Sequence, residues 1–437
     1  MTIFLIFFAF FLFALLVNYK KEWGIYLTVL LLPAYQIRFE ILSIPATFLE
    51  GLVLILLLFA AADLLKSHGL KGFVKAELAS QKIRTALIFL FLLAATISVF
   101  VAPDYKRAAG LWKAFFVEPV IFFFLAVWIV NTAKKLENLF KTFAWLLLYL
   151  GGFGVYQFLS LANLPFSWWA VDVASRRITS LLNHPNALAL LIGPLLAMLI
   201  IHMLTNKTAL RSKLFQSAAV LGAAALFLSF SRAGWLAIII SAVVFGFFTR
   251  YKKSVIASAL AVVLLTLTVP FAREKIISLL QGRDLAQENR IVLWTAAADI
   301  IKKNPLTGTG LQGFREAYKN YPLGPDRVVQ NYPHNFFLNF WVETGLLGLI
   351  SMIGLLALFY KQLWAVSKQN KGSALAVAAG MTVILLHGMA DVPYFKNDLA
   401  ILFWLILALP FLQIKDRAGE SAVPGTKYFD DVNKSPV

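Results

Sequence analysis

The chain of 437 residues contains no cysteine, and only 14% of its residues are charged. The absence of cysteine excludes disulfides, thiol nucleophiles and cysteine-ligated metals, although it is compatible with any cellular compartment. The small charged fraction, beside 60% hydrophobic residues and 39 phenylalanines, excludes an ordinary soluble domain. Acidic residues are scarce as well. The chain has 22 of them and 40 lysines and arginines, which gives a net charge of +18.

Long apolar runs recur along the chain. A run of roughly 17 to 25 residues can cross about 30 Å of hydrocarbon as a helix, which satisfies its backbone groups within the segment. The sequence therefore predicts an all-α, polytopic membrane bundle of about 12 or 13 transmembrane helices with one large extracytoplasmic loop. The expected spans are Thr2–Val17, Trp23–Arg38, Ala46–Leu65, Thr85–Val101, Lys113–Val130, Phe140–Ser160, Pro185–Leu204, Lys213–Phe230, Gly234–Thr249, Ser254–Pro270, Asn335–Tyr360, Ser373–Ala390 and Leu399–Ile414.

Basic residues gather in alternate loops between these spans, around 20–21, 66–84, 134–135, 207–213, 250–253 and 361–371. By the positive-inside rule that side is cytoplasmic, so we expect a multi-pass protein of the cell inner membrane. The positive charge then reflects topology and attraction to anionic membrane lipids. It does not indicate nucleic-acid binding, because no basic groove interleaved with stacking aromatics appears outside the spans.

The same pattern suggests a division of the chain. We expect N-terminal helices at 1–170, central helices at 171–270, an extracytoplasmic loop at 271–334, C-terminal helices at 335–414 and a disordered cytoplasmic tail at 415–437. The first apolar run lacks a positive n-region and a cleavage site, so we interpret it as a retained helix. No internal repeat is apparent, which disfavours a transporter built from duplicated halves.

Arginine occurs on the predicted outer side ahead of the seventh span. Arg177 precedes His184-Pro185-Asn186, where Pro185 suits a first helical turn and Asn183 or His184 can cap it. One interpretation is a capped helix whose arginines reach phosphate headgroups. The other places Arg177 and Asn186 at the rim of a substrate cavity.

A second arginine lies between two apolar runs with almost no loop. A charged side chain at Ser231-Arg232 costs a few kcal/mol unless it meets water or an anion. A lipid headgroup would satisfy Arg232. Its location against the positive-inside trend favours an anionic ligand, and Gly234 permits a close backbone approach.

The large loop contains a segment with helical periodicity, Leu285–Lys303. Its expected apolar stripe comprises Ile291, Trp294, Ala298 and Ile301, and such a helix would lie on the membrane surface as a lid. Arg290, near its N-terminal end, suits either a solvated salt bridge or a ligand contact.

The loop ends at His334-Asn335, at the mouth of the next span. A lone histidine in such a place is often a helix cap. The neutral imidazole that prevails near pH 7 also suits a base for a hydroxyl nucleophile.

These motifs together resemble the O-antigen ligase/polymerase superfamily over about residues 175–350, whereas the first 170 residues match it only in hydropathy. The motifs in order are Arg-Ile-Thr with Asn-His-Pro-Asn, Ser-Phe-Ser-Arg-Ala-Gly, Arg290 with Trp294 and Asn304-Pro305-Leu306-Thr307-Gly308-Thr309-Gly310, and His334-Asn335-Phe336-Phe337-Leu338 with Glu343-Thr344-Gly345-Leu346-Leu347-Gly348. The resemblance implies a GT-C-type glycosyltransferase that needs no metal and no cofactor. Its partners would be an undecaprenyl-diphosphate-linked glycan donor and an acceptor lipid or glycan hydroxyl.

The resemblance also implies roles for three residues. Arg232 and Arg290 would hold the diphosphate, because arginine pairs bidentately with phosphate and stays charged. His334 would take a proton from the acceptor hydroxyl as that oxygen attacks the anomeric carbon with inversion. No outer loop offers an Asp-x-Asp cluster, which agrees with a metal-independent reaction.

The further candidates for substrate contacts are Arg177, Asn186, Ser231, Asn335 and Asp391.

Several alternatives stay open. A polysaccharide polymerase or a protein O-oligosaccharyltransferase of the same superfamily would share these motifs and differ in its acceptor. A non-enzymatic lipid or solute carrier would place ionisable residues near the bilayer centre rather than at one face. A metalloenzyme could recruit His184, His334 and His387 with Asp391, although their spacing matches no standard ligand motif.

Overall fold

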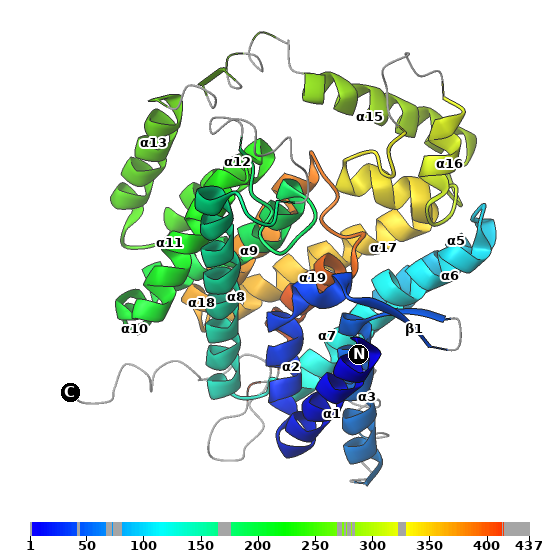
Figure 1. Ribbon diagram of the computed structural model, residues 1–437, viewed down its shortest axis with the longest axis horizontal. Coiled ribbons are helices and arrows are strands. Elements are labelled where there is room, and N and C mark those ends of the chain that lie inside the picture. Colours follow the sequence, from blue (N-terminus) through cyan, green and yellow to red (C-terminus); the bar gives the residue numbers. More distant parts are fainter. Residues whose placement is uncertain are drawn as a thin grey trace.

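The computed structural model describes residues 2–41, 44–66, 72, 81–164, 176–268, 273–274, 277, 281, 285–321, 329–412 and 414. This part of the chain is a bundle of helices with a single short hairpin (Figure 1), so the predicted all-α membrane class is confirmed. The predicted tail at 415–437 lies outside the described residues. The α-helices are α1 Thr2–Tyr19, α2 Lys21–Leu30, α3 Phe48–Lys66, α5 Lys82–Val101, α6 Tyr105–Trp112, α7 Glu118–Ile129, α8 Ala133–Ser160, α9 Pro185–Thr205, α10 Lys207–Arg211, α11 Lys213–Leu228, α12 Arg232–Gly246, α13 Lys252–Thr268, α15 Leu285–Lys303, α16 Gly313–Lys319, α17 Phe336–Ser367, α18 Lys371–Gly388 and α19 Asn397–Ala408.

Seven helical segments within the described ranges are long and apolar enough to cross a membrane. Four further apolar helices, which include α11, α12 and α19, are shorter. The count of 12 or 13 spans and the division of the chain into five parts stay predictions. The seven segments are Phe48–Lys66, Lys82–Val101, Tyr105–Ile129, Ala133–Ser160, Pro185–Thr205, Phe336–Ser367 and Lys371–Gly388.

The predicted span Trp23–Arg38 is wrong in its second half. Helix α2 ends at Leu30, because Pro33 lacks an N–H and cannot continue it, and a 3-10 turn follows at Leu32–Gln36. The chain then forms an antiparallel hairpin of β1 Arg38–Ile41 and β2 Ile44–Thr47. The period-two alternation of Arg38-Phe39-Glu40-Ile41 is the strand signal that a helical interpretation overlooks.

Helix α17 contains a sharp bend. Gly345 has φ 69° and ψ −175°, which divides α17 into an outer half, Phe336–Thr344, and the long half that follows. A Cβ at Gly345 would collide with the carbonyl oxygen of Leu306, so the 304–310 loop packs directly against the bend. The backbone N–H of Leu346 donates to that same oxygen at 3.2 Å.

Helix α15 has the predicted bounds, but its buried face is rotated from the predicted stripe. Leu293, Ala296, Ala297, Ile300 and Ile301 pack against α16 and the outer half of α17. Ile291 is 51% exposed. Apolar residues occur nearly all round this helix, so periodicity alone could not select the face that meets α17.

Helix α9 forms the centre of the part of the bundle that carries the polar residues. It packs against α8, α11, α12 and α18, and most of its side chains are buried. Figure 1 shows α15 spanning one end of the bundle, and this end is called the α15 end below.

Candidate active site

Three helix N-termini converge near the C-terminus of α18 at the α15 end. Helix α18 packs against α9, α12 and α17, which brings their first residues beside the 387–391 segment. His184, Ser231 and Asn335 are the N-cap residues of α9, α12 and α17. Helix N-termini carry partial positive charge and unpaired N–H groups, so this convergence favours an anion.

His334 and Asp391 are joined by a hydrogen bond. The Nδ1 atom of His334 lies 3.0 Å from Oδ1 of Asp391, although the two residues are far apart in the chain. The His334 side chain is 33% exposed, whereas that of Asp391 is only 10% exposed. The carboxylate is therefore largely buried, whereas the imidazole is partly accessible.

Asp391 is held on both oxygens. Its Oδ2 accepts a hydrogen bond from Nδ2 of Asn186 at 3.0 Å, and its Oδ1 also accepts from the backbone N–H of Val392 at 2.9 Å. Burial alone would raise the pKa of Asp391. The hydrogen bond from His334 and the charges of His334 and His387 outweigh burial, so this pKa falls below its ordinary value. The carboxylate is ionised at neutral pH.

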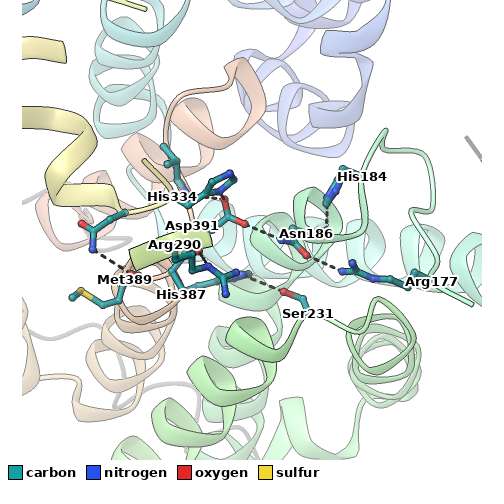
Figure 2. A network of polar contacts seen from close by, with 12 residues as sticks. Arg177, His184, Asn186, Ser231, Arg290, His334, His387, Met389 and Asp391 are labelled. Atoms are coloured by element: carbon teal, nitrogen blue, oxygen red, sulfur yellow. Dashed lines mark hydrogen bonds and ion pairs between the residues drawn. The ribbon is translucent and has the colours of Figure 1, made fainter. Parts of the chain in front are cut away.

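The network extends from Asn186 to Arg177. Arg177 donates from Nη2 to Oδ1 of Asn186 at 2.9 Å and from Nε to the carbonyl of Ser229 at 2.9 Å. Figure 2 shows a continuous row from His334 through Asp391 and Asn186 to Arg177. Burial, followed by the nearby charge of Arg232, lowers the pKa of Arg177 to about 10. Arg177 therefore stays charged at neutral pH, and an anion between Arg177 and Arg232 would relieve their repulsion.

Ser231 contacts His387, which the sequence suggests only as a possible metal ligand. Its Oγ lies 3.3 Å from Nε2 of His387, which is 1% exposed and has no hydrogen-bond partner for Nδ1. A Cβ atom added to Gly234 would lie 3.3 Å from the same ring, so the missing side chain leaves room for the imidazole beside α12. An ionisable residue inside an apolar span is the signal that could have identified His387.

Arg290 reaches the same segment from α15. Its Nε donates to the carbonyl of Ala390 at 2.9 Å, next to Asp391. Asn335 also donates from Nδ2 to the carbonyl of Met389 at 3.2 Å, while its Oδ1 accepts from the N–H groups of Phe337 and Leu338. Asn335 therefore caps α17 and fixes its start to the end of α18.

His184 has a structural role in this arrangement. Its Nδ1 accepts the backbone N–H of Asn186 at 3.1 Å and so caps α9. Burial and the charge of Arg177 lower the pKa of His184 to about 4, which keeps the ring neutral and able to accept.

The backbone is strained just before two of the helix starts. His334 has φ 49° and Phe230 has φ 51°, values that residues with a side chain adopt uncommonly. Strain of this kind persists only where the surroundings enforce it, and it is frequent at functional sites.

The metal alternative lacks a ligand set. In the ranges that the structure describes, no three His, Asp or Glu side chains gather closely enough to hold a metal ion. His184 and His387 each contact a different partner from the one that His334 contacts.

Residues 217–353 match a protein-family model, which is described as O-antigen ligase. This region of the chain is O-antigen ligase-like. The resemblance that the motifs indicate is thus confirmed over this region of a chain with several helices that can cross a membrane. The O-antigen ligase region contains Ser231, Arg290 and His334, whereas Asn186 and Asp391 lie outside it. A comparison with curated proteins finds no match.

Proposed function

We propose that the protein is a membrane glycosyltransferase that moves a glycan from undecaprenyl diphosphate to an acceptor hydroxyl, without a metal ion and with inversion. The acceptor oxygen forms a bond to the anomeric carbon, and the bond from that carbon to the diphosphate oxygen breaks. The leaving diphosphate takes the electron pair. The acceptor proton goes to His334. The active site would face the extracytoplasmic side of the inner membrane.

The observation that carries this proposal is the His334–Asp391 pair beside three cations and three helix N-termini. A carboxylate that accepts Nδ1–H of His334 fixes the tautomer whose Nε2 is the acceptor of a proton. A base must lie within hydrogen-bonding reach of the proton that it removes. The partly exposed His334 meets this need better than the buried His387.

The diphosphate would bind among Arg177, Arg232 and Arg290. Charge accumulates on this group as the sugar–oxygen bond breaks, and fixed guanidinium groups stabilise it without reorganising. The contacts of Arg177 with Asn186 and of Arg290 with Ala390 hold two of these groups in place before substrate arrives. The N-terminus of α12, which begins at Arg232, adds its dipole.

The test is transfer by the purified protein. Lipid-linked glycan extracted from the host membranes is incubated with candidate acceptors in the presence of EDTA, and both glycosylated acceptor and undecaprenyl diphosphate are measured. We expect transfer by the wild type and a loss of at least about a hundredfold in His334→Ala and Arg232→Ala. Equal transfer by both variants would reject the assignment, and dependence on a divalent ion would reject the metal-independent mechanism.

A further inference from the structure

A pocket with both polar and apolar lining lies away from the His334 network, between the end of α5 and the segment from α15 to α16. Its volume is about 430 Å³, within the range of roughly 300 to 1,000 Å³ typical of small-molecule sites. Asn304, Thr309, Glu316, Lys319 and Asn320 supply polar lining, and Val101 and Pro103 add an apolar patch.

The lining is close to neutral. Nζ of Lys319 bonds both carboxylate oxygens of Glu316, at 2.8 and 2.7 Å, so neither charge is unbalanced. The other polar groups are two amides and a hydroxyl. This lining offers both donors and acceptors, and Arg107 and Arg315 also lie near Glu316. Such a set of groups suits a ligand with many hydroxyl groups.

The loop that forms one wall of the pocket is already held in place without a ligand. Gly308 and Gly310 have φ of 65° and 78°, and a Cβ on either would collide with the backbone at Val342 or Ala102. The N–H of Thr309 donates to the carbonyl of Val342 at 2.7 Å. These contacts fix the loop against α5 and α17, and a fixed loop loses little entropy when it binds.

The pocket and His334 are connected through the outer half of α17. Thr309 is bonded to the outer half of α17 at Val342, and that half begins beside His334. A helical rise of about 1.5 Å per residue places the two points roughly 10 Å apart along α17. An oligosaccharide can span such a distance, whereas a single sugar ring cannot.

We propose that this pocket is a subsite for a sugar ring of a glycan substrate, remote from the bond that reacts. This inference rests on the proposed glycosyl transfer. The ring would exchange hydrogen bonds with Glu316, Lys319 and the two asparagines, and its C–H face would lie on Val101 and Pro103.

The test compares the intact host lipid-linked glycan with the same donor trimmed by exoglycosidases to its first sugar. For the wild type we expect trimming to raise KM by about tenfold, the equivalent of one or two lost hydrogen bonds. In Lys319→Gln and Asn304→Ala the two donors should have equal KM, and kcat with the trimmed donor should stay at the wild-type value. The matched control is Lys302→Gln, which removes an equivalent i,i+3 pair with Asp299 on α15 outside the pocket and should behave as wild type.

A second arm keeps the donor trimmed and varies the acceptor length, which tells whether the ring comes from the donor or the acceptor. A third arm measures saturation-transfer NMR between the protein and the free oligosaccharide that mild acid releases from the intact donor, and it needs no catalysis. A signal that weakens in Lys319→Gln but not in Lys302→Gln supports the subsite even if no transfer occurs, in which case only the proposed function fails. Variants that respond as the wild type does in all three arms would overturn the inference.

Discussion

Replacement of Asp391 by asparagine should slow transfer without weakening donor binding. The side chain keeps its shape, but the negative charge beside His334 disappears. Its 3.0 Å contact with Nδ1 and its small exposure indicate a charge-assisted hydrogen bond, worth about 1.5 to 3 kcal/mol. If that energy supports His334 only in the transition state, kcat falls about 10- to 150-fold. An asparagine at this position also has only one side-chain oxygen, so it cannot accept hydrogen bonds from both His334 and Asn186 on separate oxygens as the wild-type carboxylate does.

The assay is steady-state transfer, with kcat and KM for the donor measured from pH 5 to pH 8. The pKa of Asp391 lies below its ordinary value, so the wild-type carboxylate stays ionised throughout this range. The variant should therefore have a lower kcat than the wild type at every pH in this range, with an unchanged KM. The control is Asp299→Asn, which alters an outlying carboxylate of α15. A variant within twofold of the wild type at every pH, or a loss confined to KM, would refute the reasoning.

Three other predictions concern the arginine cluster, the α9 cap and the topology. Arg232→Lys keeps the charge but not the bidentate geometry, so kcat/KM for the donor should fall about 10- to 100-fold, and unchanged kinetics would contradict a phosphate contact. His184→Asn preserves the α9 cap, so activity at pH 7 should persist. The folded-state pKa of His184 lies below its unfolded value of about 6.5, so unfolding takes up a proton and stability falls as pH drops from about 6.5 towards 4. The variant should lose part of this dependence in thermal melts, and an unaltered slope would contradict the burial of the ring. In this cysteine-free chain, Lys302→Cys should react with an impermeant maleimide added outside intact cells, and labelling only after lysis would reverse the predicted orientation.

The sequence predicts the helices of this fold well, because their signals are local. Hydropathy identifies the apolar runs, and the cap at His184 follows from a side chain at the helix start. The cap of α17 is Asn335 rather than the neighbouring His334 that the sequence suggests. The bounds of α15 follow from its periodicity and from Asn304-Pro305. The buried face of α15 does not, because it depends on packing against α17.

The site is predictable in its residues but not in its connections. Motifs point to Arg232, Arg290 and His334. The pairing of His334 with Asp391 joins residues 57 positions apart, and that of Ser231 with His387 joins residues 156 positions apart. Such contacts depend on how α18 packs against α9, α12 and α17. No local sequence pattern predicts this tertiary arrangement. The sequence suggests Asp391 as a substrate contact, which stays a prediction, and its bonds to His334 and Asn186 follow from no local pattern.

The most direct test measures two quantities for each variant: equilibrium binding of undecaprenyl diphosphate and single-turnover transfer. Together they tell whether the arginines hold the leaving group while His334 takes the proton of the acceptor. We predict that Arg232→Ala and Arg290→Ala weaken this binding at least about tenfold. His334→Ala should bind it as the wild type does and yet transfer no glycan. Undiminished binding in both arginine variants, or normal transfer by His334→Ala, would contradict the account.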